Sequence, residues 1–414
     1  MLRHLLHIVW NERNANLLIG LELLVVSLSL VYLADYAVTK GYIYTRPMGL
    51  NIDNVAYIRL KSLWPSHPRY RADDTTDWRD KIPALLQRIE NHPAVEAVCY
   101  GRCAFPYQGN SETISLFFQE KEAPEDVFFR TISPSFVDVF RLESTFSTRE
   151  ELKQALAAGY YVPSTGAASL FQISPKELLD QKMACRGYRD TVEFTVKEMV
   201  NEVRMNEIAL EGPSIFAYSA AKLDYFLEKY PNSLMYGFRL KDGAQITPHE
   251  LYLEMRDQLQ AGNWVCDDFV PICELKERRQ EDFFNELKLN GLYMTFLFLS
   301  IFLGVVGTFW YRAQQRRSQI GLRISMGATP RQVLGLYLSE GVLLLLSTLP
   351  FTAVGYGVLS SYGILSDVAV HFISRAPLAF LLAYGVLALL ILLAIWIPTR
   401  LVVRVSPSQS MRDE

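Results

Sequence analysis

The residues best placed to do chemistry form a basic segment, RRSQIGLRISMGATPRQV, at positions 316–333. It contains no acidic residue and lies between two long uncharged runs. Gly327 fits the position that ends a helix, and Thr329 and Gln332 have the spacing of a capping box that starts the next one. The pattern predicts a short basic helix between two hydrophobic helices.

Other arrangements of reactive side chains are missing from the sequence. The six histidines form no HExxH motif, and neither a G-x-S-x-G elbow nor a G-x-x-x-x-G-K-[ST] loop occurs. None of the five cysteines has the paired C-x-x-C spacing of a zinc site. We therefore expect no catalytic site, no metal site and no cofactor in this chain.

The five cysteines all lie between positions 99 and 273. An oxidising compartment would permit disulfides, and the local candidates are Cys99 with Cys103 and Cys266 with Cys273. An odd count leaves at least one thiol unpaired in a monomer. The alternative interpretation is that the cysteines are small buried hydrophobic residues.

Long uncharged runs predict membrane spans. The mean hydropathy of the 414 residues is +0.10, and about 20 apolar residues cross a bilayer core. The first run is longer than the apolar region of a cleaved signal peptide, so we favour an uncleaved span. The predicted fold is an α-helical membrane protein with four transmembrane helices plus a large α+β extracytoplasmic domain of two subdomains. The predicted spans are 17–35, 290–310, 333–360 and 377–397.

The arginines of the short segments predict orientation, because cytoplasmic loops are enriched in Lys and Arg. Three segments are basic and are placed in the cytoplasm: 1–16, 311–332 and 398–414. The short loop 361–376 and the large segment 36–289 then lie on the other side. The net charge of −3 argues against a nucleic-acid partner.

The large segment shows a weak internal repeat. A strand at 54–61 precedes a helix and strand at 80–101, and a strand at 233–243 precedes a helix and strand at 246–270. Strand-like runs at 112–120, 127–133 and 191–200 predict a β-rich insertion over about 104–232. The charged helix predicted at 273–293 continues into the second span as a stalk.

Two acidic residues, Glu22 and Glu340, lie inside predicted spans. Charges at such depth usually face the helix bundle and pair. One hypothesis is that they pair with Arg312 or Arg323, and the alternative is that each carboxylate reaches water at the membrane surface. We expect the spans to lack a buried chain of polar residues suited to a hydrophilic conduit.

The basic segment resembles the cytoplasmic loop of MacB/FtsX-type (type VII) ABC transporter permeases, which reads roughly R-x-E-I-G-[IL]-R-[RK]-A-[LM]-G-A-[ST]. Gln319 replaces the acidic residue of that pattern, and Ile324 replaces its second basic residue. Glu340 early in the third span, the closing residues 404–414 and residues 159–171 are also similar to the family. The matching loop positions are Arg317, Ile320, Gly321, Leu322, Arg323, Met326, Gly327, Ala328 and Thr329.

The resemblance implies that the short helix is a coupling helix that docks on a separate ABC ATPase subunit, which binds ATP and Mg²⁺. It implies a multi-pass protein of the inner membrane with cytoplasmic termini, a periplasmic domain and a second permease copy or paralogue beside it. A periplasmic adaptor and an outer-membrane channel are further candidate partners. The implied ATPase-contacting residues are Arg316, Arg317, Gln319, Ile320, Gly321, Arg323, Ile324, Met326, Gly327, Ala328 and Thr329.

The function implied is export or extrusion of an amphiphile, peptide or lipoprotein by mechanotransmission, the relay of ATPase motion to the periplasmic domain. The alternative is an FtsX-like regulator that relays this motion to a periplasmic enzyme without transport. A third hypothesis is a ligand receptor that needs no ATPase. In that case the basic segment would be an interfacial helix that binds anionic membrane lipids.

Overall fold

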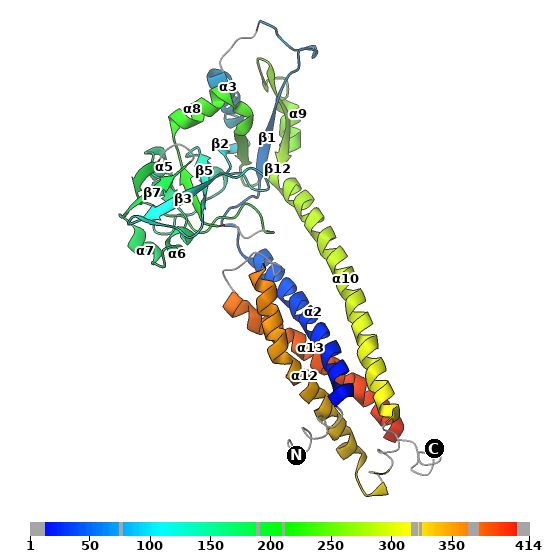
Figure 1. Cartoon of the computed structure of the whole chain (residues 1–414). Helices are drawn as coiled ribbons and strands as arrows, with labels where there is room; N and C mark the ends of the chain where they lie inside the picture. The colour runs from blue at the N-terminus through cyan, green and yellow to red at the C-terminus, as the bar shows by residue number, and fades with distance from the viewer. Residues whose placement is uncertain are drawn as a thin grey trace. The chain divides into compact units, whose positions relative to one another are not determined.

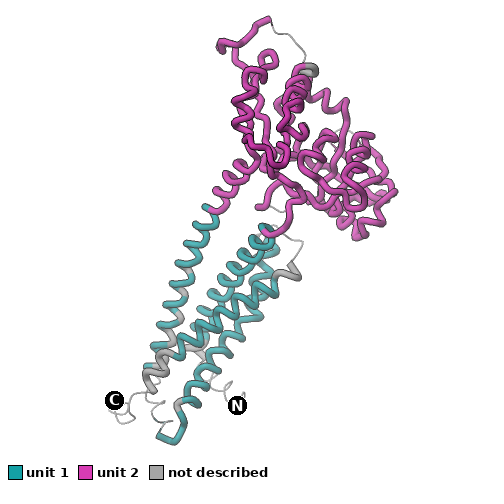
Figure 2. Tube along the Cα trace, turned by 180° about the vertical axis from the view of Figure 1, so that it is seen from behind, with its two compact units in different colours: residues 1–44, 285–414 teal, residues 45–284 magenta. Residues whose placement is uncertain are grey.

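The computed structural model describes residues 13–73, 78–187, 191–208, 212–315, 322, 325–362 and 372–403. The chain divides into two compact units, coloured separately in Figure 2. We call residues 1–44 and 285–414 the helix unit, and residues 45–284 the sheet unit.

Long helices make up the described part of the helix unit. Among the described residues, four helices are long and apolar enough to cross a membrane, as the predicted fold requires. Apolar side chains of α2, α12 and α13 share one buried cluster that includes Leu23, Leu344 and Leu387. The helices are α2 (Arg13–Thr45), α10 (Ile272–Gln315, which begins in the sheet unit), α12 (Pro330–Ser361) and α13 (Phe372–Val403) (Figure 1).

All four helices extend beyond the predicted spans, and α2 and α10 extend furthest. The helix α2 continues past residue 35 to Thr45, and α10 begins at Ile272 rather than near 290. Hydropathy marks only the apolar part of a helix, whereas the backbone hydrogen bonds continue through the polar turns beside it. The predicted stalk helix at 273–293 is confirmed as part of α10, and the limits of the spans stay predictions.

Capping residues explain where two helices begin. The Thr329 side chain accepts a hydrogen bond from the Gln332 amide, and the Gln332 side chain accepts one from the Thr329 amide at 2.9 Å. The same reciprocal pair joins Thr247 and Glu250 at the start of α9 (Pro248–Met255). The box at Thr329 lies where the sequence predicts it, because capping depends on residues only three apart.

The sheet unit is built on one mixed sheet. In it, β1 pairs antiparallel with both β12 and β10, and β10 pairs antiparallel with β2. The two predicted strand–helix–strand repeats are therefore interleaved, since each half contributes alternate strands of the central order β12-β1-β10-β2. These strands are β1 (Val55–Ser62), β2 (Val95–Arg102), β10 (Met235–Leu240) and β12 (Trp264–Pro271).

The predicted insertion continues this same sheet. Beyond β2 the order runs through β5, β3, β7 and β8, while β9 pairs parallel with β5. The strands predicted near 112–120, 127–133 and 191–200 are confirmed by β3, β5 and β8. The strand bounds are β3 (Thr113–Phe118), β4 (Lys121–Glu122), β5 (Val127–Ile132), β6 (Val162–Pro163), β7 (Lys182–Arg186), β8 (Thr191–Thr195), β9 (Ser214–Ala217) and β11 (Gln260–Ala261).

Separate clusters of apolar side chains fill the sheet unit. One lies around β1, β2, β10 and β12 under α3, α8 and α9, and another lies within residues 114–217. A third includes α4 and α5. Because the strands of both ends belong to one sheet, the division into two subdomains stays a prediction. The remaining helices are α3 (Trp78–Glu90), α4 (Phe136–Val139), α5 (Arg149–Ala157), α6 (Gly166–Ser169), α7 (Pro175–Leu178) and α8 (Ala220–Lys229).

Candidate functional sites

The segment before α12 contains the end of one helical turn and the N-cap residue of α12. The Met326 amide donates to the Leu322 carbonyl at 3.0 Å, and Gly327 has a φ of +95°. Such a φ suits glycine at a helix C-terminus, as predicted. The Met326 side chain is 72% exposed. Docking of an ATPase here stays a prediction, and part of the predicted contact set lies outside the described residues: Arg316, Arg317, Gln319, Ile320, Gly321, Arg323 and Ile324.

The two acidic residues of the predicted spans face other helices. Glu340 on α12 is buried. Glu22 on α2 is half-buried and lies against α10, since a Cβ added to Gly304 would lie 2.9 Å from Glu22 Oε1. The side chains of Arg312 and Arg323 lie outside the described residues, so the predicted pairing with them stays a hypothesis.

A buried chain of hydroxyl groups links three helices of the helix unit, and the expectation that the spans lack a chain suited to a hydrophilic conduit stays a prediction. Thr352 of α12 lies 2.6 Å from the Ser27 hydroxyl of α2 and accepts a hydrogen bond from Tyr384 of α13 at 3.0 Å. The Tyr384 hydroxyl also lies 3.2 Å from that of Thr348. Hydropathy averages hide such residues, because isolated hydroxyls barely lower the mean of a long apolar run.

A buried carboxylate extends this polar interior. Asp35 of α2 is 1% exposed and accepts a hydrogen bond from the Tyr356 hydroxyl at 2.9 Å. The sequence offered a signal for the whole arrangement, because Thr348, Thr352 and Tyr356 recur every four residues and therefore share one helix face. Serine and threonine hydroxyls commonly join helices in this way within membranes.

One segment of the sheet unit, residues 202–207, holds the chain where it enters from α2. We call this segment the clasp. The Arg204 guanidinium donates to the Arg46 carbonyl at 3.0 Å, and the Arg204 amide donates to the Met48 carbonyl at 2.8 Å. Gly49 packs so closely that an added Cβ would lie 2.2 Å from the Glu202 carbonyl oxygen. Glycine is therefore required at position 49, where φ is +74°.

The clasp also holds the first turns of α10, where the chain leaves the sheet unit. Lys276 Nζ lies 2.8 Å from one carboxylate oxygen of Glu207, and the Tyr107 hydroxyl donates to the other at 2.7 Å. Burial raises the pKa of Glu207, but the hydrogen bonds from Lys276 and Tyr107 outweigh it and hold this pKa below its usual value. Both connections of the sheet unit are thus bonded to the clasp.

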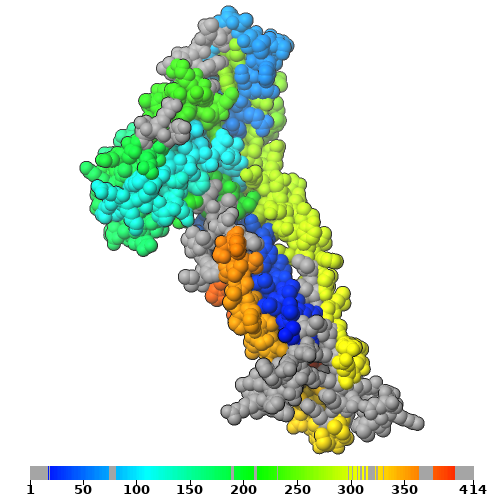
Figure 3. All heavy atoms as spheres, in the orientation of Figure 1, coloured from blue at the N-terminus to red at the C-terminus, as the bar shows by residue number. Residues whose placement is uncertain are grey.

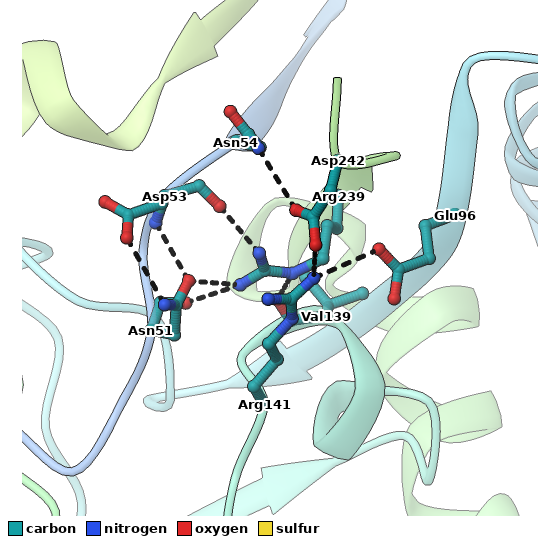
Figure 4. A network of polar contacts seen from close by, with 8 residues as sticks. All are labelled: Asn51, Asp53, Asn54, Glu96, Val139, Arg141, Arg239 and Asp242. Carbon is teal, nitrogen blue, oxygen red and sulfur yellow. Dashed lines mark hydrogen bonds and ion pairs between the residues drawn. The ribbon is translucent and has the colours of Figure 1, made fainter. Parts of the chain in front are cut away.

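A buried arginine on β10 holds the loop at residues 51–53, which precedes β1. Arg239 on β10 is 0% exposed and donates to the carbonyls of Val139, Asp53 and Asn51 at 2.6, 2.7 and 2.8 Å (Figure 4). Burial is the main cause that lowers its pKa. A buried charge is tolerated only when its donors are used. Arg239 therefore ties residues 51–53, which follow the stretch held by the clasp, to β10 and to α4.

The cysteines form neither of the predicted disulfides, because all five are free thiols and only Cys273 is exposed. Cys99 lies within β2, where a rise of about 3.3 Å per residue carries the chain too far for a bond to Cys103 that needs Cα atoms within about 7 Å. The extended β12 likewise separates Cys266 from Cys273. Burial raises the pKa of Cys266 to about 12. The alternative interpretation, that the cysteines are small buried hydrophobic residues, fits four of the five cysteines.

No sequence pattern indicates the clasp, because its partners come from distant parts of the chain. Glu207 and Lys276 are ordinary charged residues in ordinary polar segments, and only the fold brings them together. Among the described residues, no group of three or more His, Cys, Asp or Glu side chains is placed to hold a metal ion.

Comparisons with known proteins find similarity to permeases. Residues 291–407 match the family described as FtsX-like permease C-terminal. A domain from Porphyromonas gingivalis, whose parent protein is named as a permease, shares 15% identity at a TM-score of 0.34 and covers 54% of this chain and 92% of its own. The extracellular domain of the noncanonic ABC-type transporter YknZ from Gram-positive bacteria shares 12% identity at a TM-score of 0.30, with 51% and 98% covered.

The comparison with curated proteins finds no match. The matched region 291–407 contains most of α10 beyond the sheet unit, the basic segment, α12 and α13. It therefore includes the same loop on which the sequence resemblance was recognised. The C-terminal region of the chain, residues 291–407, is therefore similar to FtsX-like permeases.

Proposed function

We propose that this chain is the membrane subunit of an ABC transporter whose ATPase is a separate chain. The four helices cross the membrane, the sheet unit lies on the extracytoplasmic side, and the basic segment docks on the ATPase. The chain itself is non-catalytic and works beside a second permease chain. The family match and the arginine-rich connection at 311–332 support this assignment.

The observation that carries the proposal is the continuity of α10. It is one helix from Ile272 to Gln315, which at about 1.5 Å per residue is about 66 Å long. Its first turns are bonded to the clasp through Lys276 and Glu207, and its last turn precedes the basic segment. A displacement of the ATPase-bound end is therefore relayed along a stiff rod to the sheet unit.

The polar interior of the helix unit fits a mechanical role better than a conduit. The hydroxyls of Ser27, Thr352 and Tyr384 bond directly to one another at 2.6 and 3.0 Å. Groups that satisfy each other in this way join helices, whereas a conduit needs groups that face water. We therefore propose that an amphiphile, a peptide or a lipoprotein is extruded by motion of the sheet unit.

Co-purification tests the proposal. The tagged chain is solubilised in detergent from its host, and the eluate is assayed for a co-purified ATPase chain and for ATP hydrolysis. Wild type is compared with a Gly327→Pro, Ile320→Asp double variant, in which proline cannot adopt the φ of +95° found at Gly327. Loss of the ATPase from a folded double variant supports docking at this segment.

Two results would overturn parts of the proposal. If no nucleotide-binding chain co-purifies with wild type under any condition, the basic segment is a lipid anchor and a receptor function takes precedence. If the ATPase is bound and stimulated but reconstituted vesicles move no amphiphile or peptide, the chain is an FtsX-like regulator. A Lys276→Met variant sharpens the test, because it releases α10 from Glu207 and is expected to weaken the coupling while the ATPase stays bound.

A further inference from the structure

A cavity of about 580 Å³ opens in the sheet unit between the end of α8 and the sheet formed by β3, β5 and β7. Figure 3 shows this side of the unit, where the cyan segment with β3 and β5 meets the green segments with β7 and α8. The volume lies within the range of small-molecule sites. The lining residues that matter here are Arg102, Glu112, Phe129, Tyr161, Lys222 and Phe226.

The walls of the cavity are aromatic. Phe129 is buried at its base and packs at 5.9 Å from the Tyr161 ring, which in turn stacks on Phe194 at 5.0 Å. Tyr225 and Tyr230 also line it and are about half exposed. Stacked rings fixed at the base and exposed rings at the rim provide a preformed surface for an apolar body.

The polar groups of the cavity leave one positive charge in excess. Arg102 forms an ion pair with Glu112. Lys222 is a second cation beside this pair, and its Nζ lies 4.4 Å from the centre of the Phe129 ring. Burial lowers the pKa of Lys222, as expected for a cation that has lost water. Burial also raises the pKa of Cys185 to about 11, so this lining thiol is neutral near pH 7.

The aromatic walls would ordinarily attract cations, but the protein supplies its own. Lys222 lies over Phe129, and the guanidinium of Arg102 lies 4.8 Å from the centre of the Phe226 ring. A cationic ligand would therefore be repelled by Lys222 and Arg102 at the ring faces that it would otherwise contact. An anion instead gains a charge-assisted hydrogen bond from Lys222.

We propose that this cavity binds a small amphipathic carboxylate, with its apolar body against Phe129, Tyr161 and Phe226 and its acidic group on Lys222. The proposal goes beyond the function proposed above and concerns the sheet unit alone. It holds whether the chain transports or regulates, because no step of it involves an ATPase.

Photolabelling of the full chain in lipid nanodiscs tests the proposal, with 4-benzoylbenzoate as the probe. We expect labelled peptides to include those that contain Phe129, Tyr161 or Tyr225, as located by mass spectrometry. Decanoate is expected to compete with this labelling, whereas decyltrimethylammonium at the same concentration is not. The cationic competitor controls for partitioning of the apolar chain into the membrane.

Variants of α8 test the role of the charge. Lys222→Met keeps the stem and removes the ammonium, so labelling at these peptides is expected to fall about 10-fold. Lys222→Arg is expected to retain most of it, and Lys229→Met, on the same helix but outside the cavity lining, to label as wild type. Thermal melting verifies that each variant is folded.

Three outcomes would overturn the proposal. They are labelling confined to peptides of the helix unit, equal competition by the cationic amphiphile, and wild-type labelling in a folded Lys222→Met protein. None of them affects the co-purification experiment, so failure of this site and failure of the transporter assignment are distinguishable.

Discussion

The two units bury polar groups in different ways. The sheet unit encloses a whole charge, Arg239, and satisfies it with carbonyl oxygens of Val139, Asp53 and Asn51. The helix unit joins its helices through pairs of side chains, such as the hydroxyls of Ser27 and Thr352 and the Tyr356 hydroxyl with the buried Asp35 carboxylate. In the sheet unit an arginine side chain binds irregular backbone, whereas in the helix unit side chains of neighbouring helices bind each other.

The difference follows from which backbone groups are free. Irregular segments leave carbonyl oxygens that need donors, and one guanidinium with five N–H groups can serve several of them. A helix uses its own carbonyls internally, so neighbouring helices must be joined through side chains. A buried charge is therefore structurally essential in the sheet unit, whereas each single hydroxyl in the helix unit contributes little.

The largest expected effect is the loss of Arg239. An Arg239→Met variant leaves several buried carbonyls without donors, and we expect the sheet unit to lose about 3–5 kcal/mol of its free energy of unfolding. Hydrogen exchange of the β1 and β10 amides in the full chain measures it. Arg256→Met is the matched control, because the Arg256 side chain is 61% exposed. A loss of unfolding free energy below about 1 kcal/mol in Arg239→Met would contradict the difference between the two units.

An intermediate effect is expected in the helix unit. Thr352→Val keeps the shape of the side chain and removes the hydroxyl that meets Ser27 and Tyr384, at an expected cost of about 0.5–2 kcal/mol. Detergent-induced unfolding of the helices measures this cost. Thr295→Val is the control, since the exposed Thr295 hydroxyl donates to Gly291 of its own helix. A cost as large as that of Arg239→Met would remove the distinction between the units.

The smallest effect is expected at the clasp, where an ion pair is partly open to water. Glu207→Gln is expected to cost about 0.5–1 kcal/mol at pH 7. The pKa of Glu207 is lower in the folded protein than in the unfolded chain. Its contribution to stability is therefore complete above the usual carboxyl pKa and is lost as the pH falls through the folded pKa. Wild type therefore loses this stability on acidification, and the Gln variant does not.

Unfolding followed from pH 7 to pH 3 checks this expectation. Glu281→Gln, at an exposed position of α10, is expected to keep the wild-type pH dependence. Identical pH profiles for wild type and Glu207→Gln would show that the clasp is not held by this carboxylate.

Local chemistry made much of the fold predictable. The strands near 54–61 and 233–243 and the helix start at Thr329 are predictable because alternation and capping involve residues only a few positions apart. The interleaving of the two repeats was not predicted, since pairing of β1 with β10 and β12 depends on contacts across most of the sheet unit.

The candidate sites were less predictable for the same reason. The clasp joins Arg46, Glu207 and Lys276, and no periodicity relates such positions. The hydroxyl chain was visible in the spacing of Thr348 and Thr352 but was outweighed by the apolar residues around them. The predicted disulfide pairs do not form, because residues close along the chain are far apart in space when they lie on an extended strand.

The place of β1 in the sheet has a consequence for biosynthesis. This strand leaves the ribosome early, yet both of its neighbours, β10 and β12, are made only after residue 234. Its backbone groups must therefore stay unpaired while the intervening chain is synthesised, a condition that favours slow folding and invites wrong pairing. The central sheet closes only when β12 is complete, immediately before α10 begins, so a nascent chain that stalls before Trp264 is a natural substrate for chaperones and proteases.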